Sequence, residues 1–223
     1  MTTKTKSTKP SPEGQAAETK SAKKTGGGAA AAARRILAEE NPQSKIAEHG
    51  ETLMEGPRTA ATQSARVLSE IIVEKPELVV PLVAKFSKGI SSSNKRVVQT
   101  SAEALPAIAR IAPARVARQL DVLKASFEEA NDVGKDGLVK TFAALCTASV
   151  AYQKRLEPVL TTALNGADGK TLLAWTQIVL PALKGEPHAR ARAVVEGRLN
   201  LIPRSYAQQI ADFLGIKLRL RYR

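Results

Sequence analysis

The sequence predicts an all-α protein, and three observations lead to that prediction. Apolar stretches recur along residues 42–215 and are separated by Pro, Gly, Asn and Asp, residues that begin and end helices. Aromatic residues make up only 4% of the 223-residue chain, so Ala, Val, Leu and Ile must fill the core. Alanine has the highest helix propensity, and small side chains let helices approach closely. No hydrophobic alternation typical of strands occurs before the last seven residues.

The first segment, residues 1–28, is predicted to be a disordered basic tail. It combines Lys, Thr, Ser, Pro, Gly and Glu with almost no large apolar side chains. Such a segment cannot bury enough surface to offset the entropy lost on ordering. Its cations are candidate auxiliary contacts to an anionic partner: Lys4, Lys6, Lys9, Lys20, Lys23 and Lys24. A tail that only keeps the protein soluble is the alternative.

The folded body is expected to span residues 29–216. A first helix is predicted over residues 29–40, and it stops at Asn41-Pro42 because a residue before proline is disfavoured in the helical conformation. Further helices are predicted near residues 43–55, 58–74, 77–88, 94–111, 114–130, 135–150, 152–164, 169–183, 188–199 and 204–214. Prolines fall at or just before five of these starts, where a missing N–H costs nothing: Pro57, Pro76, Pro113, Pro187 and Pro203.

An internal repeat organises this body. The run Ser64-Ala65-Arg66-Val67-Leu68-Ser69-Glu70-Ile71 is similar to Ser101-Ala102-Glu103-Ala104-Leu105-Pro106-Ala107-Ile108, 37 residues later. Pro76 and Pro113 share that spacing. A helix pair that recurs at this interval predicts an α-solenoid, in which each pair buries its apolar face against its neighbours.

The run Val97-Val98-Gln99-Thr100-Ser101-Ala102-Glu103-Ala104-Leu105 resembles the second helix of a HEAT repeat. The resemblance covers roughly residues 42–215 and implies a right-handed stack of about four to five HEAT-like helix pairs. Val98 stands where the family usually places an Arg, and Ser92 or Ser93 stands where it places an Asp. Because such solenoids bind many kinds of partner, the resemblance implies a fold and not a particular function.

The formal net charge of +13 is distributed unevenly along the chain. Residues 1–35 carry +6, residues 36–183 carry +1, and residues 184–223 carry +6. The positive charge therefore lies almost entirely at the two ends, and lysine and arginine there can neutralise phosphates and release counterions.

The C-terminal arm, residues 217–223, alternates basic and apolar side chains. In an extended conformation four cations would lie on one side, and Leu218, Leu220 and Tyr222 would lie on the other, available to pack on the last helices. Together with arginines of the adjoining repeat, the arm predicts a C-terminal basic surface: Arg190, Arg192, Arg198, Arg204, Lys217, Arg219, Arg221 and Arg223. Contact with nucleic-acid phosphates, contact with an acidic protein, and simple solvation all remain open.

No catalytic, cofactor-binding or metal-binding site is predicted. His49, beside Glu48, is interpreted as a solvated helix-end residue, and His188 lacks partners at metal-ligand spacing. Cys146 is the only cysteine, so no intrachain disulfide can form, and it is interpreted as a small core residue. Trp175 shares a helical face with Ile178 and is also interpreted as core.

Two glycine-containing segments lack the spacing of a P-loop. They are Gly134-Lys135-Asp136-Gly137 and Gly166-Ala167-Asp168-Gly169-Lys170, and both are interpreted as inter-helix loops. Neighbouring carboxylates such as Glu128-Glu129 point in different directions on a helix, which disfavours a shared-proton pair.

The leading hypothesis is a non-enzymatic protein that binds the backbone of duplex DNA or structured RNA. Single-strand binding is disfavoured because it generally uses stacked aromatic residues. The alternative is a scaffold that binds a protein along the concave face, near Lys95, Arg96 and Lys140. A DNA glycosylase-like enzyme, an activity some HEAT-like proteins have, ranks third.

The chain lacks an apolar run of about 18 residues, so no membrane span is expected. An intracellular location, in the cytoplasm or with the nucleoid or nucleus, is expected. The oligomeric state is not predicted.

Overall fold

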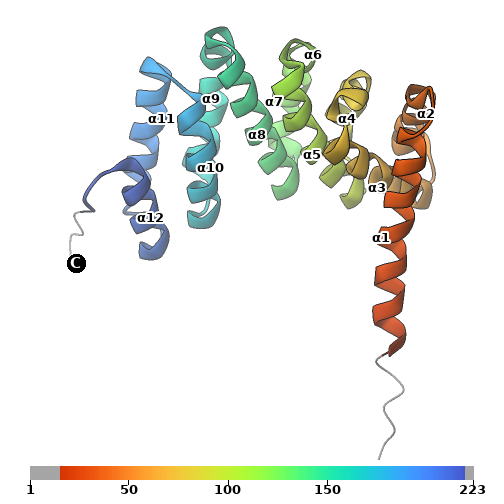
Figure 1. Cartoon of the computed structure of the whole chain (residues 1–223). Helices are drawn as coiled ribbons and strands as arrows, with labels where there is room; N and C mark the ends of the chain where they lie inside the picture. Colours follow the sequence, from red (N-terminus) through yellow and green to blue (C-terminus); the bar gives the residue numbers. More distant parts are fainter. Residues whose placement is uncertain (1–15, 219–223) are drawn as a thin grey trace, which may run out of the picture.

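The computed structural model describes residues 16–218, with side chains from residue 27 onward (Figure 1). All regular structure in this part of the chain is helical, so the predicted all-α class is confirmed for it. None of the helices found between these limits is both long and apolar enough to cross a membrane.

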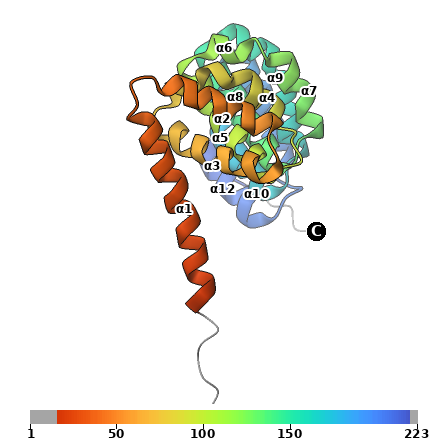
Figure 2. The same cartoon turned by 90° about the vertical axis from the view of Figure 1, so that its right-hand side faces the viewer.

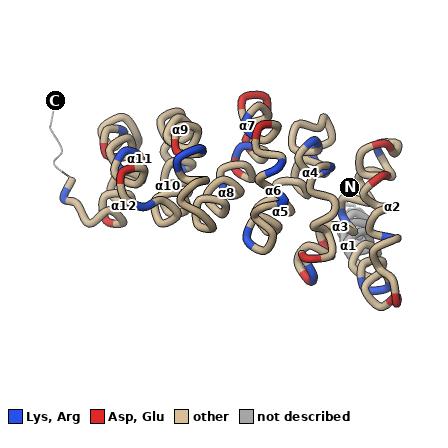
Figure 3. The backbone as a smooth tube through the Cα atoms, turned by 90° about the horizontal axis from the view of Figure 1, so that it is seen from above, with Lys and Arg blue, Asp and Glu red and all other residues tan. Residues whose placement is uncertain are grey.

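The helices form a curved array of two rows, which are seen side by side from above in Figure 3. The first row consists of α3 (Arg58–Glu74), α5 (Lys95–Ile111), α8 (Asp132–Ala148), α10 (Gly169–Ala182) and α12 (Arg204–Leu214). The second row consists of α2 (Pro42–Glu55), α4 (Val83–Gly89), α7 (Leu120–Glu129), α9 (Val150–Gly166) and α11 (Gly185–Arg198). Each first-row helix packs on the next one in its row.

The chain alternates between the rows, so each edge of the array contains one kind of turn. At the upper edge in Figure 1, first-row helices end and second-row helices begin. At the lower edge, on the inside of the curve, second-row helices end and first-row helices begin. Two short elements lie at upper-edge turns: the 3₁₀ helix η1 (Pro76–Leu82) precedes α4, and α6 (Pro113–Ala117) precedes α7.

The 37-residue interval recurs in both the core and the helix caps. Leu68, Leu105, Phe142 and Val179 follow one another at this interval, and each side chain is fully buried. Asn94, Asn131 and Asp168 also follow one another at 37 residues, and each side chain caps the start of a first-row helix. A side-chain oxygen at this position accepts a hydrogen bond from a backbone N–H that has no partner within the helix.

Helix α1 (Ala16–Leu37) begins earlier than the helix predicted over residues 29–40. Its last turns pack on α3 through the buried residues Ala29, Ala33 and Ile36, whereas its first turns project away from both rows (Figure 2). Residues 1–15 of the predicted tail, with Lys4, Lys6 and Lys9, lie outside the described residues. The backbone of Lys20, Lys23 and Lys24 belongs to α1.

Three local predictions were wrong. The helices predicted over residues 77–88 and 114–130 are each divided, into η1 and α4 and into α6 and α7. Pro81 accounts for the first break, because it supplies no N–H and disfavours a continuous α-helix. The run from Gly134 to Gly137, interpreted as a loop, lies within α8, whose cap at Asn131 starts the helix earlier.

Candidate binding surfaces

Arg190, the first arginine of the predicted C-terminal basic surface, joins two second-row helices. Its Nε and Nη2 donate hydrogen bonds to the two carboxylate oxygens of Glu157 on α9, at 3.1 and 3.2 Å. Its Nη1 also donates to Glu186, one turn earlier on α11. The hydrogen bond with Glu157 is the main cause that raises the pKa of Arg190 above its usual value. The charge of Arg190 is thus compensated within the protein.

Arg192 and Arg198 also make contacts within the protein. Arg192 Nε donates to Glu196 at 2.7 Å, and its Nη2 donates to the backbone carbonyl of Leu214 at 3.1 Å. Arg198 donates to the backbone carbonyls of Asn165 and, at 2.8 Å, Ala167. These carbonyls lie at the ends of α12 and α9, where helices leave acceptors unpaired. Both arginines therefore connect neighbouring helices.

Arg204 and Lys217 differ from these three arginines. Both are exposed, and neither forms an ion pair with another residue in the range 27–218. Leu218 packs against the core, as expected for the apolar side of the arm. Arg219, Arg221 and Arg223 lie outside the described residues.

The sequence explains part of the difference between the paired arginines and the two unpaired cations. Glu186 and Arg190 are four residues apart, as are Arg192 and Glu196, and such pairs face each other on a helix. The contact between Arg190 and Glu157 joins residues 33 positions apart and has no local signal.

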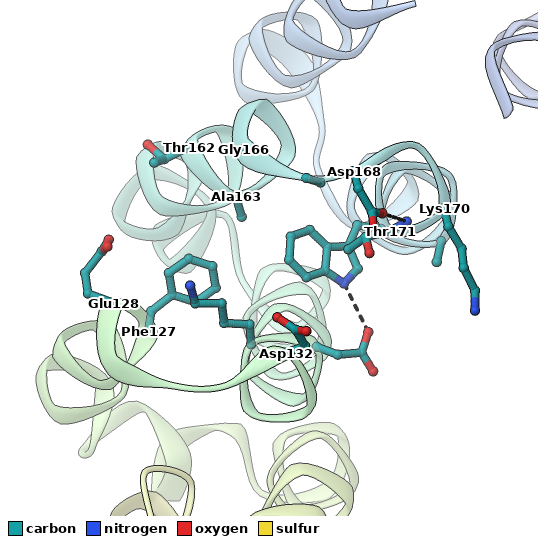
Figure 4. Close-up of a pocket in the computed structure, with 14 residues that line it drawn as sticks. Phe127, Glu128, Asp132, Thr162, Ala163, Gly166, Asp168, Lys170 and Thr171 are labelled. Carbon is teal, nitrogen blue, oxygen red and sulfur yellow. Dashed lines mark hydrogen bonds between the residues drawn. The ribbon is translucent and has the colours of Figure 1, made fainter. Parts of the chain in front are cut away.

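A groove of about 710 Å³ opens at the lower edge, between the ends of α7 and α9 and the starts of α8 and α10 (Figure 4). Small residues leave this space open: Ala163, Gly166, Ala167 and Ala174 all line it. The rings of Phe127 and Trp175 lie at its inner wall, and each residue is 6% exposed. The prediction that Trp175 belongs to the core is confirmed, although one side of it borders the groove.

Trp175 is tied to an acidic residue in this groove. Its indole Nε1 donates to Asp136 Oδ1 at 3.0 Å, and the other oxygen of Asp136 lies 2.6 Å from Lys140 Nζ. Asp136 is thus held by two donors, Trp175 and Lys140.

Carboxylates outnumber cations along the groove. Its lining includes Glu128, Asp132, Asp136 and Asp168 against Lys135 and Lys170. The backbone N–H of Thr171 donates to Asp168 at 2.7 Å, which is the main cause that lowers the pKa of Asp168. Lys135 Nζ lies 5.8 Å from the centre of the Phe127 ring, within the range of a cation–π contact. The groove is therefore a poor site for a phosphate and a better one for a basic segment.

The lower edge also contains two of the cations proposed for the scaffold hypothesis. Lys95 is exposed at the start of α5. Arg96 is half-buried, and its Nη1 donates to Gln99 at 3.1 Å. Lys140, the third, is paired with Asp136.

His49 and Cys146 both have structural environments. His49 is half-buried within α2, and its Nδ1 lies 3.1 Å from Ser64 Oγ, so the prediction of a solvated helix-end residue was wrong. It lies three residues after Ile46 and four before Leu53, both buried, which places it beside the apolar stripe of α2. Cys146 is fully buried, as predicted, and burial raises the pKa of its thiol to about 12.

Within the part of the chain that the structure describes, no group of three or more His, Cys, Asp or Glu side chains is arranged to hold a metal ion. In comparisons with known proteins, no family model, no curated protein and no solved structure matches this chain.

Proposed function

We propose that this chain is a non-enzymatic, HEAT-like α-solenoid that binds the backbone of duplex DNA or structured RNA. One observation carries the proposal: twelve of the thirteen net positive charges lie in residues 1–35 and 184–223. Attraction between such cations and phosphates requires no folded site, because it results from the release of condensed counterions.

The side-chain contacts reduce the number of cations at the C-terminal end that are available to bind a nucleic acid. Arg190, Arg192 and Arg198 are engaged in contacts between helices. Arg204 and Lys217 are exposed at the same end of the array. We assign these two residues, followed by the basic residues of the arm, as the C-terminal contact.

A salt titration of fluorescent duplex DNA and RNA binding by the full chain tests this proposal. The variant Arg204→Gln/Lys217→Gln is compared with Lys45→Gln/Lys88→Gln, which removes two exposed cations from α2 and α4. For B-DNA, the slope of log K against log salt should fall by about 0.9 for each phosphate that the protein no longer neutralises. Absence of wild-type binding at about 0.1 M salt, where exposed charges are screened beyond roughly 10 Å, would contradict the proposed function.

The second candidate function is a scaffold that binds a basic protein segment at the lower edge. It is favoured by the groove, which combines four carboxylates with small side chains on the inside of the curve. Capture of a stoichiometric protein after nuclease treatment, abolished by Asp132→Asn/Glu128→Gln, would support it. Retention of the same protein by that variant would argue against the groove as its site.

A further inference from the structure

The central helix pairs carry an excess of exposed cations at the upper edge of the array. Five exposed cations lie at the upper edge, and we call this set the basic edge: Arg110, Arg115, Arg118, Lys154 and Arg155. No Asp or Glu occurs in residues 104–120 or 137–156, the segments that form these turns. The near-neutral charge of residues 36–183 therefore conceals a local excess of positive charge.

The five cations come from elements that meet in space. Arg110 lies in the last turn of α5, Arg115 lies in α6, and Arg118 caps the end of α6. Helix α6 packs on α8, which leads directly into the first turns of α9, where Lys154 and Arg155 lie. In Figure 3, which views the upper edge, basic segments lie beside α6 and at α9.

One ion pair joins a cation of this set to a neighbouring helix. Arg155 Nη2 on α9 lies 3.6 Å from Asp121 Oδ1 on α7. Arg118 precedes Asp121 by three residues, at the turn between α6 and α7. The Asp121 side chain is 91% exposed, and an ion pair so open to water is weak. It leaves the guanidinium of Arg155 free to exchange Asp121 for a phosphate.

The excess charge is confined to these two turns. At neighbouring upper-edge turns, Lys75 lies beside Glu74 and Glu77, and Lys184 lies two residues before Glu186. At the lower edge of the same helix pairs, charges of both signs are exposed: Lys95 as well as Glu128, Glu129 and Asp132. A polyanion would thus be attracted more strongly to the basic edge than to the lower edge of these helix pairs.

We infer that the basic edge binds the sugar–phosphate backbone of duplex nucleic acid, an inference that rests on the proposed function and adds a second, rigid surface to it. Four of its five cations are arginines, whose planar guanidinium groups can donate two parallel hydrogen bonds to a phosphate. Tyr152, the aromatic residue within this edge, is half-buried and packs on the core. The edge therefore contacts the backbone and does not stack on bases.

The test compares two triple variants of the full chain in the same salt titration. Arg115→Gln/Arg118→Gln/Arg155→Gln removes the three arginines of the basic edge that follow α5. Lys45→Gln/Arg58→Gln/Lys88→Gln removes three exposed cations from α2, α3 and α4 and gives the same net charge. For B-DNA, the first variant should lower the slope by about 0.9 for each arginine that contacts a phosphate, and lower affinity on the order of tenfold or more at 0.1 M salt.

Each outcome decides the inference. Wild-type binding that the basic-edge variant loses and the control variant keeps would support it. Wild-type binding that both variants weaken equally would overturn the basic edge and leave the C-terminal proposal standing. Equal wild-type affinity for polyglutamate and for duplex of matched charge would overturn the choice of nucleic acid in favour of an acidic protein, for which the exposed Ile111 and Val150 would supply apolar contacts.

Discussion

The indole Nε1 of Trp175 donates a hydrogen bond to Asp136 Oδ1 at 3.0 Å, and this contact joins α10 to α8 across 39 residues. Asp136 also pairs with Lys140 one turn later on its own helix. The two residues therefore hold neighbouring helix pairs in register at the inner wall of the groove.

Trp175→Phe should remove this hydrogen bond while keeping an aromatic ring in the core. We expect the free energy of unfolding to fall by about 1–2 kcal/mol, because a hydrogen bond to a charged acceptor contributes somewhat more than one between neutral groups. Urea unfolding of the single variants and of Trp175→Phe/Asp136→Ala would measure the coupling between the two side chains. Additive single effects would show that the contact contributes nothing to stability.

Gly137 allows α8 to approach α5 closely. A Cβ atom at this position would lie 2.4 Å from the Cβ and 2.5 Å from the Cα of Ala102. Because the second contact is with backbone, the helices would have to move apart, and Gly137→Ala should lower the free energy of unfolding by about 3 kcal/mol. Gly197→Ala is the matched control, since nothing lies within 4 Å of its Cβ position. That change should raise stability by about 0.5–1 kcal/mol, as glycine within a helix is unfavourable.

The helices themselves were largely predictable, because their limits depend on local chemistry. Proline and glycine marked most starts and ends, and the spacing of apolar residues gave the buried faces. The breaks at Pro81 and after α6 were not predicted, because the two parts of each divided helix follow one continuous apolar pattern. Side-chain capping by Asn131 starts α8 three residues before the predicted helix, which is why Gly134-Lys135-Asp136-Gly137 looked like a loop.

The candidate surfaces were harder to predict, because they depend on which turns become neighbours. The groove unites residues from α7 to α10, and the basic edge unites the end of α5 with the start of α9. Net charge summed over residues 36–183 hid that edge, because carboxylates elsewhere in this segment offset its five cations. Counting charge turn by turn would have found it.

Cys146 should resist alkylation in the folded protein. Its thiol is fully buried and has a pKa of about 12 against an ordinary value of 9.0, so the thiolate is about a thousandfold scarcer at pH 8. The raised pKa also predicts that the contribution of Cys146 to stability is constant below about pH 9 and falls between pH 9 and 12, since the unfolded thiol loses its proton first. Iodoacetamide labelling followed by mass spectrometry, with and without urea, measures the protection. Rapid labelling without urea would refute it.

His49 should make stability depend on pH below neutrality. Burial is the main cause that lowers its pKa below the ordinary 6.5, so the unfolded chain binds a proton more readily than the folded chain. The stability that neutral His49 contributes is complete above pH 6.5, and it is lost as pH falls through the lowered pKa of the folded chain. Urea unfolding at about pH 5.0–7.5 should show this decrease in the wild type, and His49→Gln should remove that part of it. An unchanged pH profile in the variant would assign the effect to other groups.

Substitution of Arg190 should distinguish an arginine that stabilises the fold from one that binds a nucleic acid. Arg190 binds both oxygens of Glu157, a carboxylate whose side chain is only 10% exposed. Arg190→Gln would leave that carboxylate nearly buried without its cation, so the midpoint of urea unfolding should fall. Affinity for duplex DNA should change by less than about twofold, because the substitution removes no cation that binds a phosphate. Arg204→Gln should do the reverse, weakening binding with little change in the midpoint. A large decrease in the affinity of a fully folded Arg190→Gln protein would show that Arg190 releases Glu157 to reach the partner.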